Sequence, residues 1–352
     1  MIAMHVPDGF LDATTSIATG AVAAGAIGVS LQKANTELRE SGPALAGLTS
    51  VFVFAVQMVN FPVGAGTSGH LMGGALAAAL VGPWTAVLVM SVVLIVQALF
   101  FADGGLTALG TNISLIAIVT VVAGYLVTRG LLAVLPKRPG SIVPAAGVAA
   151  FVSVPLAALA FVGLYAVGGA VPIPLGSLTA AMVGWHTVIG VGEALITAAV
   201  VGAVVATRPD LIHAVRHLRR ELVLVDADGR TTTVTPDAPV KVEPGRRPLA
   251  IGLAVSLLIA GVVSLFASAH PDGLESVAEG LGFAHSANES AVAGSPLAGY
   301  GFSLAGNRLV AGALAGVIGV LITGLVALAL TALARRGRGD ARPERELARS
   351  DA

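Results

Sequence analysis

Residues 70–84 read His70-Leu71-Met72-Gly73-Gly74-Ala75-Leu76-Ala77-Ala78-Ala79-Leu80-Val81-Gly82-Pro83-Trp84, and this stretch decides the topology of the chain. Its apolar part, 70–81, is short for a membrane span, which takes about 20 residues. Because proline stops a helix and glycine permits a turn, we expect the chain to reverse at Gly82-Pro83. Short helices at membrane depth usually line a site, since non-helical backbone is tolerated there only where protein or a cavity buries it.

The lysine and arginine residues favour this reversal over one long helix across 70–101. If the N-terminus lies outside, all of the 20 basic residues except Arg308 fall on the inner side of the membrane, as the positive-inside rule predicts. A single long helix would invert every later loop and divide the basic residues between the two sides. The inner segments are then 31–43, the turn at Gly82-Pro83, 129–142, 207–247 and the tail from 335. We therefore expect a multi-pass protein of the cell membrane with an extracytoplasmic N-terminus and a cytoplasmic C-terminus.

The composition is that of a helical membrane protein. Of 352 residues, 55% are hydrophobic and only 11% are charged, whereas a soluble domain has about 25% charged residues. The abundant glycine and alanine allow membrane helices to approach closely. The predicted fold is an all-α polytopic membrane protein with about nine spans, a seven-helix bundle followed by a two-helix module. The expected spans are about 12–30, 44–60, 70–81, 84–101, 109–128, 143–169, 178–206, 248–267 and 307–334.

Shifts in polarity divide the chain into four parts. The expected parts are a membrane domain (1–206), a cytoplasmic basic helix, hairpin and linker (207–247), a two-span module with an extracytoplasmic loop at 268–306 (248–334) and a charged cytoplasmic tail (335–352). Within the second part, two short apolar and threonine-rich runs flank an Asp-Ala-Asp-Gly turn, which predicts a β-hairpin at 221–235.

Several kinds of chemistry are excluded. The chain has no cysteine, so thiolate metal sites and disulfides are ruled out. Its net charge of zero gives no indication of nucleic-acid binding. It has no G-x-x-x-x-G-K-[ST] motif, so any transport driven by ATP needs separate ATPase subunits.

Two histidines predict a metal site. In a chain that begins Met4-His5, the terminal amine, the His5 amide nitrogen and its imidazole Nδ1 can wrap one ion in two fused chelate rings. One more nitrogen, for which His70 is the candidate, completes a square plane that suits Ni(II) or Cu(II) and accepts Co(II). The alternative is that His5 is a solvated terminal residue and His70 a hydrogen-bonded core residue. An ionisable residue inside a membrane favours the functional interpretation.

The written sequence places three residues, Met1-Ile2-Ala3, before this motif. With that extension the amine cannot join a compact chelate. We expect translation to start at Met4, or the three residues to be removed, and mass spectrometry of the purified protein tests this.

Further polar residues in apolar surroundings form three candidate groups. Some could orient the ligands or stabilise the N-terminal segment, with helix capping and loop hydrogen bonding as the alternative. A pair seven residues apart on one helix could relay protons or metal, or form a structural contact between helices. A turn outside the membrane could handle the hydrated ion, or cap the protein. In that order the groups are Asn60, Ser68, Asp103 and Asn112; His186 and Glu193; His270, Asp272 and Glu275.

Several motifs resemble the CbiM/NikM family, the substrate-binding membrane components of energy-coupling factor importers for cobalt and nickel. They are Met4-His5-Val6-Pro7-Asp8-Gly9-Phe10-Leu11, Pro62-Val63-Gly64-Ala65-Gly66-Thr67-Ser68-Gly69-His70-Leu71, Gly82-Pro83-Trp84, Gln97-Ala98-Leu99-Phe100-Phe101-Ala102-Asp103-Gly104-Gly105-Leu106-Thr107-Ala108-Leu109-Gly110 and His186-Thr187-Val188-Ile189-Gly190-Val191-Gly192-Glu193-Ala194. The resemblance covers about 4–206. The stretch 248–334, with Pro271-Asp272-Gly273-Leu274-Glu275, resembles the PDGLE module that accompanies this family.

The resemblance implies a seven-helix subunit whose N-terminus is tucked into the bundle from outside. It places the metal on the terminal amine, the His5 amide and imidazole, and the His70 imidazole. The implied partners are a transmembrane coupling subunit, the ATPase subunits and the lipid bilayer. Small-residue faces at Ala21/Gly25 or at Ala44 to Gly47 could pack against the coupling subunit.

We therefore predict a transport subunit for Co(II) or Ni(II), with cobalt slightly favoured, and neither an enzyme nor a protein with a resident cofactor. One alternative is an intramembrane metalloenzyme that uses His70, His186 and Glu193. It lacks H-E-x-x-H or a similar zinc motif. Another alternative is an ion-coupled secondary transporter, which the absence of two clear halves weakens.

Overall fold

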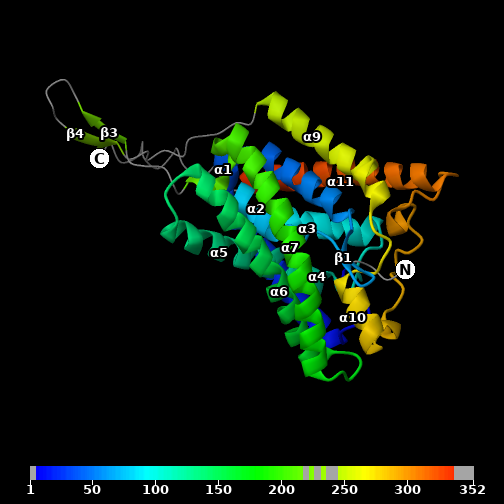
Figure 1. Ribbon diagram of the computed structural model, residues 1–352. Helices are drawn as coiled ribbons and strands as arrows, with labels where there is room; N and C mark the ends of the chain where they lie inside the picture. The colour runs from blue at the N-terminus through cyan, green and yellow to red at the C-terminus, as the bar shows by residue number, and fades with distance from the viewer. Residues whose placement is uncertain (1–4, 217–221, 226–230, 235–244, 337–352) are drawn as a thin grey trace, which may run out of the picture.

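The computed structural model describes residues 5–216, 222–225, 231–234 and 245–336, and these are mostly helical (Figure 1). The α-helices are α1 (Ala13–Gln57), α2 (Gly74–Val81), α3 (Pro83–Phe100), α4 (Leu109–Asn112), α5 (Thr120–Val134), α6 (Ile142–Gly168), α7 (Leu175–Thr207), α8 (His213–Arg216), α9 (Arg246–Gly261), α10 (Gly273–Leu281) and α11 (Arg308–Arg336). A π-helical stretch, η1 (Ile113–Val119), joins α4 to α5. Two antiparallel hairpins consist of β1 (Phe61–Gly64) with β2 (Thr67–Gly69) and β3 (Leu222–Val225) with β4 (Thr231–Val234).

The expected apolar runs lie largely in helices, and seven helical stretches of the described chain are long and apolar enough to cross a membrane. The predicted multi-pass helical fold is therefore confirmed. Helix α2 has 8 residues and is about 12 Å long, so it is the short helix that the sequence predicts. The chain reverses at Gly82, which has φ 91° and ψ 160°, and Pro83 is the first residue of α3. The hairpin predicted at 221–235 is present as β3 and β4, whereas its turn, the linker and most of the charged tail lie outside the described residues.

Helix α1 differs from the prediction, because the segment expected as an inner loop, 31–43, is almost entirely helical. The break is confined to Gly42, with φ 76° and ψ 153°, and Pro43 follows it. The residues before Gly42 include Gln, Lys, Ala, Glu, Leu and Arg, which favour helix. The buried carboxylate of Glu37 also accepts backbone hydrogen bonds from Trp84 (3.3 Å) and Thr85 (2.7 Å) at the start of α3. The helix therefore continues as far as Gly42, because Glu37 fixes its last part against α3.

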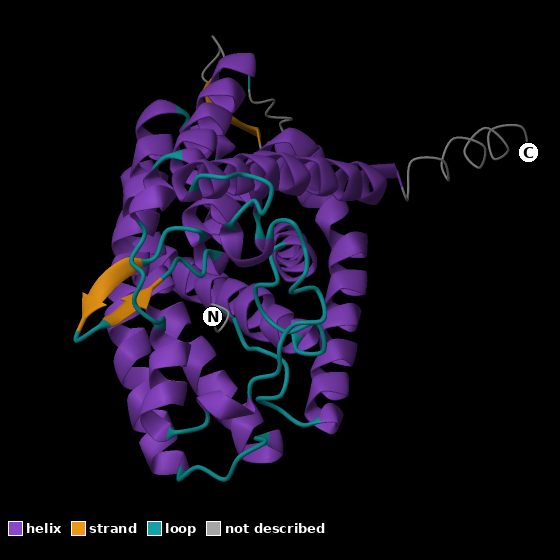
Figure 2. Cartoon of the chain, turned by 90° about the vertical axis from the view of Figure 1, so that its right-hand side faces the viewer, coloured by secondary structure: helices purple, strands orange, loops and turns teal. Residues whose placement is uncertain are grey.

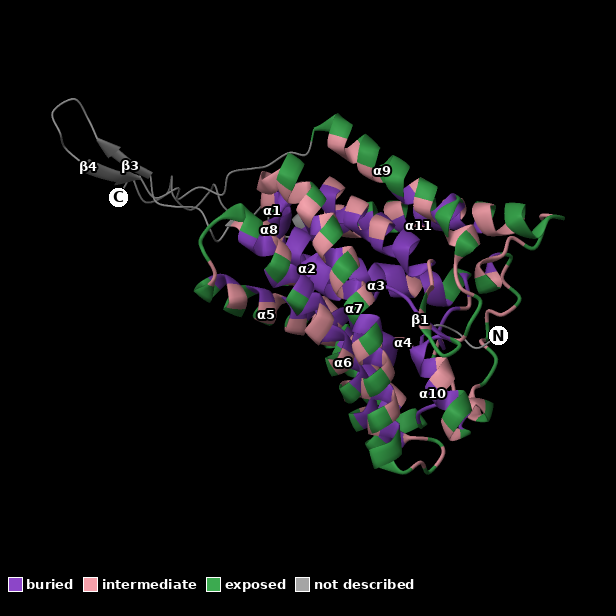
Figure 3. Ribbon diagram, in the orientation of Figure 1, coloured by how far each residue is buried: buried purple, intermediate pink, exposed green. Residues whose placement is uncertain are grey.

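Helix α2 lies at the centre of the bundle, and all of its residues are buried (Figure 3). Small residues make this possible. A Cβ atom on Gly124 of α5 would lie 2.5 Å from the Ala75 Cα, and one on Gly74 would lie 1.8 Å from the Thr120 Oγ1. Close approach of α2 and α5 therefore requires glycine at these two positions.

The C-terminal helices α9 and α11 pack against each other and along α1 (Figure 1). A Cβ on Gly47 of α1 would lie 2.9 Å from Leu328 of α11, and one on Gly319 of α11 would lie 2.2 Å from Phe54 of α1. The C-terminal loop, residues 267–307, connects α9 to α11 and contains α10. This loop lies with other loops around the described N-terminus (Figure 2).

Candidate metal centre

The N-terminal arm, residues 5–12, turns at Asp8-Gly9 and is held in the bundle by hydrogen bonds. The Val6 amide donates to the Asn112 side-chain oxygen (2.9 Å), and the Asn112 side-chain amide donates to the Val6 carbonyl (3.0 Å). The Gly105 amide also donates to that carbonyl (3.0 Å). Asn112 therefore pairs with the backbone of the arm as a neighbouring strand would.

Asp8 connects the arm to two loops. Its carboxylate accepts backbone hydrogen bonds from residues 106–108 at 2.8–3.1 Å and one from the Thr107 hydroxyl at 2.5 Å. Its backbone carbonyl accepts from the amide of Asn288 in the C-terminal loop (2.7 Å). Next to it, Gly9 has φ 91°, and a Cβ there would lie 2.2 Å from the Ser286 carbonyl oxygen. Glycine is required here by both the backbone conformation and the close contact.

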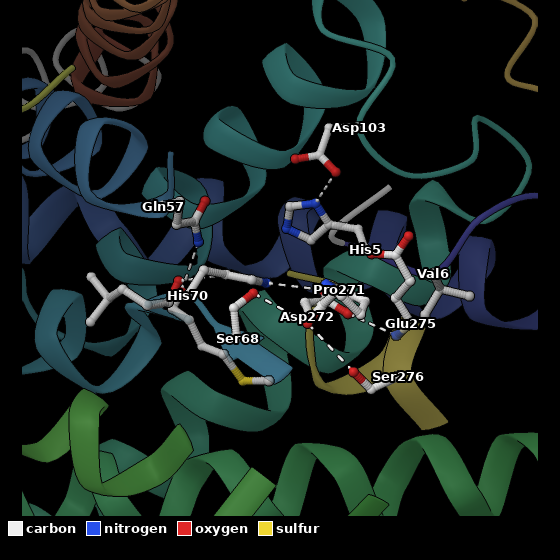
Figure 4. A network of polar contacts seen from close by, with 12 residues as sticks. His5, Val6, Gln57, Ser68, His70, Asp103, Pro271, Asp272, Glu275 and Ser276 are labelled. Atoms are coloured by element: carbon white, nitrogen blue, oxygen red, sulfur yellow. Dashed lines mark hydrogen bonds and ion pairs between the residues drawn. The ribbon is translucent and has the colours of Figure 1, made fainter. Parts of the chain in front are cut away.

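His5, at the tip of the arm, is buried, with 2% of its surface exposed. Its Nδ1 lies 3.0 Å from Oδ1 of Asp103 (Figure 4), and neither ring nitrogen has a hydrogen-bond partner among the described residues. Burial acts to lower the pKa of His5, but the carboxylate of Asp103 outweighs burial and raises it. Burial acts to raise the pKa of Asp103, but His5 and a hydrogen bond from the Tyr300 hydroxyl lower it. The two side chains therefore stabilise each other as an ion pair.

His70 lies between the β1–β2 hairpin and α2. Its Nδ1 is 3.0 Å from the Leu71 carbonyl oxygen, which directs Nε2 away from its own backbone. The backbone that follows is held by side chains from the bundle. Glu193 of α7 accepts the amides of Met72 (2.6 Å) and Gly73 (2.8 Å), and the Gln57 amide of α1 donates to the Met72 carbonyl (2.9 Å). Both Glu193 oxygens therefore hold backbone next to His70.

The two imidazoles are close enough to share one ion. Their ring centroids are 5.4 Å apart and their planes are tilted by 58°. An ion at about 2.0–2.1 Å from a ring nitrogen lies roughly 3.2 Å from the ring centre, so two ligating rings lie within about 6.4 Å of each other. Both rings line one cavity. Its lining is His5, Val6, Gly69, His70, Met72, Asn112, Leu115, Ile116, Ala157, Ala158, Phe161, Met182, His186, Ile189, Asp272, Gly273 and Leu274.

The C-terminal loop closes one side of this cavity. Asp272 is 4% exposed, and its Oδ2 lies 3.9 Å from the His70 Nε2. Its Oδ1 accepts the Glu275 amide (2.8 Å) and so caps α10. Burial raises the pKa of Asp272 to about 7. The loop is anchored through Ser68, whose hydroxyl donates to the His270 carbonyl (2.8 Å) and whose amide donates to the Pro271 carbonyl (2.8 Å) (Figure 4).

The structure sorts the predicted residues by what they contact. Asp103 and Asn112 contact the arm, whereas Ser68 and the Asn60 carbonyl contact the C-terminal loop, the latter through the Ser268 amide (2.8 Å). His186 lines the cavity and bonds the Met182 carbonyl through Nδ1 (2.8 Å). Of the accessory residues, Asp272 lines the cavity, while His270 and Glu275 take part through backbone atoms. Met4 lies outside the described residues.

The sequence did not predict a role in the site for Asp8 or Tyr300. Asp8 follows a proline and precedes a glycine, which marks a turn, and that pattern could have identified it as a capping residue. Tyr300 lies in an irregular loop far along the chain, where no spacing points to the site.

Among the described residues, no group of three or more His, Cys, Asp or Glu side chains is arranged to hold a metal ion. The cavity is lined by the imidazoles of His5, His70 and His186 and by the Asp272 carboxylate, so nitrogen donors predominate among its ionisable side chains. Nitrogen donors of this kind suit Ni(II), Co(II) and Cu(II) better than Mg²⁺ or Ca²⁺.

Comparison with protein families identifies two regions of the chain. Residues 5–211 match the CbiM family, described as a cobalt uptake substrate-specific transmembrane region, and residues 246–336 match the PDGLE domain.

Relatives with similar sequences carry names of metal transport proteins. A protein of Archaeoglobus fulgidus, named as a candidate fused nickel transport protein NikMN, is 34% identical over 94% of this chain and 99% of its own length. The fused nickel transport protein NikMN of Rhodobacter capsulatus is 35% identical over 59% of this chain and 64% of its own. The cobalt transport protein CbiM of Sorangium cellulosum is 34% identical over 55% and 87%.

A solved structure has a similar fold. The crystal structure of a truncated transition metal transporter aligns with a TM-score of 0.51 and 30% identity, covering 57% of this chain and 98% of that one.

Proposed function

The chain belongs to the CbiM family of cobalt-uptake transmembrane proteins, and we propose that it captures Co(II) or Ni(II) as the substrate-binding subunit of an energy-coupling factor importer. It is a membrane component of cobalt or nickel transport. The transport names of its relatives agree with the prediction that it is not an enzyme. Both substrates stay in the proposal, because the family description names cobalt and the relative matched over most of its length is named for nickel.

The observation that carries the proposal is the meeting of His5 and His70. They come from segments far apart in the chain, yet both are buried and face one cavity with rings 5.4 Å apart. Among the described residues, the buried ring nitrogens of His5 have no hydrogen-bond partner, which is unfavourable unless a ligand completes them. An ion bound to this ring would give each nitrogen a partner, the ion for one and Asp103 for the other.

The proposed ligand set is the His5 imidazole and amide, the His70 imidazole and, in a chain that begins at Met4, the terminal amine. The chelate uses Nδ1 of His5, which faces Asp103 in the structure. Turning the ring about its Cβ–Cγ bond presents Nδ1 to the amide and leaves Nε2 on the side of Asp103. Asp103 then orients the bound imidazole, as outer carboxylates commonly do for metal-bound histidine.

We assign the remaining polar residues of the site supporting roles. The Asp272 carboxylate is the group in the C-terminal loop that a hydrated ion would meet in the cavity, since it lies 3.9 Å from the His70 Nε2. His186 also lines the cavity and remains the candidate for a relay. Glu193 holds backbone, so its role is to position the His70 segment.

The coupling subunit needs an accessible small-residue face. The face at Ala44 to Gly47 is packed against Leu328 of α11 at Gly47, whereas Ala21 and Gly25 are exposed. We therefore propose the Ala21/Gly25 face as the docking surface for the coupling subunit, with separate ATPase subunits completing the importer. Replacing both residues by Leu is expected to abolish co-purification of the coupling subunit, and intact assembly would contradict this assignment.

The proposed orientation places the arm and the C-terminal loop outside the cell. The distribution of basic residues supports it, because Arg308 is the one Lys or Arg expected on that side. Labelling of a cysteine placed at exposed His285 by an impermeant reagent, in a chain that has no other cysteine, tests the orientation.

The test of function is Ni(II) and Co(II) binding to the purified full chain in detergent. We expect His5→Ala and His70→Ala each to remove high-affinity binding, because each opens the coordination plane. The matched control is His285→Ala, an exposed histidine of the C-terminal loop that does not line the cavity, which should bind as the wild type does. Wild-type metal affinity in His70→Ala would exclude that residue from the metal site. Wild-type metal affinity in a protein that keeps Met1 would exclude the terminal amine from the ligand set.

A further inference from the structure

Tyr300 joins the C-terminal loop to the groups around His5. Its hydroxyl donates to Oδ2 of Asp103 at 2.5 Å, while Oδ1 of the same carboxylate lies 3.0 Å from the His5 Nδ1. One carboxylate therefore contacts Tyr300 through one oxygen and His5 through the other. A carboxylate fixed at both oxygens has a defined plane, and this plane sets the direction in which the imidazole is held.

The position of Tyr300 is fixed by contacts other than this hydrogen bond. Its ring stacks on Phe101, with centroids 5.0 Å apart and planes at 29°. The amide of Gly299 donates to the Phe101 carbonyl at 2.9 Å. Tyr300 also has φ 57°, in the left-handed region, which is unfavourable for a residue other than glycine. Such a conformation persists only where the surroundings determine it.

The Asp103 side of the contact is anchored in the membrane bundle. The Asp103 amide donates to the Gln97 carbonyl (3.1 Å), and the Gln97 side chain donates to Gln57 (3.0 Å). Gln57 in turn donates to the Met72 carbonyl, two residues after His70. The backbone of Asp103 is thus fixed with the His70 segment, while its carboxylate meets a hydroxyl from the C-terminal module.

We propose that Tyr300 is a positioning residue of the metal site, through which the C-terminal module orients the Asp103 carboxylate and so the His5 imidazole. The inference rests on the proposed function in one respect, that His5 binds the ion. It assigns the module a part in the affinity of a site whose proposed ligands all lie in the N-terminal domain.

The variant Tyr300→Phe separates positioning from packing, because it keeps the ring that stacks on Phe101 and removes only the hydroxyl. We expect Ni(II) affinity of the full chain in detergent to fall about 10-fold, at the low end of the effect of outer partners on metal sites. The absorption bands of bound Ni(II) should also shift, since the ring orientation changes. The matched control is Tyr165→Phe. The Tyr165 hydroxyl donates to the Val171 carbonyl (2.9 Å), and its loss should leave affinity within about twofold of the wild type.

A double-mutant cycle with Asp103→Ala, which removes both side-chain oxygens, tests whether Tyr300 acts through Asp103. In that background Tyr300→Phe should change affinity by less than about twofold, because coupled residues have non-additive effects. An equal loss in both backgrounds would overturn the proposal, as would wild-type affinity and an unshifted spectrum in Tyr300→Phe. Failure of the wild-type chain to bind Ni(II) and Co(II) would instead contradict the proposed function.

Discussion

The two histidines of the candidate metal centre are held in different ways. The backbone after His70 is bonded to Glu193 and Gln57, which come from the buried faces of membrane helices. The backbone beside His5 is bonded to Asn112 and to loop atoms, and Asp8 adds part-buried or exposed bonds to residues 106–108. The His70 segment is thus held by the bundle core, whereas the arm is buried at His5 and Val6 and reaches the surface at Asp8.

This difference indicates which ligand moves. Releasing the His70 segment would leave buried backbone groups without partners in a region that water does not reach, which is costly. Releasing the arm breaks the buried bonds between Val6 and Asn112, but its bonds at Asp8 lie near the surface, where water can replace them. Ligand-binding segments are generally drawn from such low-stability parts of a fold. The comparison therefore predicts that, of the two proposed ligands, His70 is the fixed one and His5 the one that opens and closes the site.

The largest effect is expected from removing the support of the fixed ligand. Glu193→Ala leaves the amides of Met72 and Gly73 buried without acceptors, each costing about 1–3 kcal/mol, so the free energy of unfolding should fall by about 2–6 kcal/mol. Thermal unfolding in detergent measures this loss. His5→Ala, at the tip of the arm, should lose metal binding with a much smaller change in unfolding temperature.

Glu193→Gln is the graded control, since its side chain keeps one acceptor oxygen for the two amides. It should unfold between the wild type and Glu193→Ala. Equal unfolding temperatures for Glu193→Ala and His5→Ala would contradict the division into a fixed and a movable ligand.

A smaller effect is expected from loosening the arm at its buried end. Asn112→Ala removes the two hydrogen bonds to Val6, worth about 1–3 kcal/mol together, so Ni(II) affinity should fall roughly 5- to 150-fold. The unfolding temperature should change less than in Glu193→Ala. The matched control is Asn35→Ala, because the Asn35 amide donates to the Ala334 carbonyl, away from the cavity. An affinity as high as that of the wild type would show that Asn112 does not hold the arm in its binding position.

The sequence was sufficient for the features that depend on local signals. The short helix α2 follows from a glycine and proline after a brief apolar run, and the helices follow from long apolar runs. The helix over 31–41 was not predicted. Its polar residues suggested a loop between two spans, but the chain turns only at Gly42-Pro43. Polar residues in a membrane protein predict a loop only where no buried partner holds them, and Glu37 has such partners.

The part of the site that could not be predicted depends on contacts between distant segments. The sequence places Glu193 in apolar surroundings and leaves open a relay or a structural contact between helices, but it could not determine that both oxygens face backbone amides. Tyr300 is equally hidden, since its partner Asp103 is in the other domain. Residue types indicate which groups need a partner, and only the packing of the helices and loops determines which partner they have.

The smallest effect is expected at the exposed attachment of the arm. Thr107→Val keeps the shape of the side chain and removes its hydrogen bond to Asp8, which retains three backbone donors. The lost bond contributes about 0.5–1.5 kcal/mol, so Ni(II) should dissociate roughly 2- to 10-fold faster, as measured by stopped-flow transfer to a chelator. Thr187→Val is the control, because the Thr187 hydroxyl bonds the carbonyl of Val183 within α7. If dissociation is equally fast in the wild type and Thr107→Val, opening of the arm does not limit release, and His5 cannot be the ligand that gates the site.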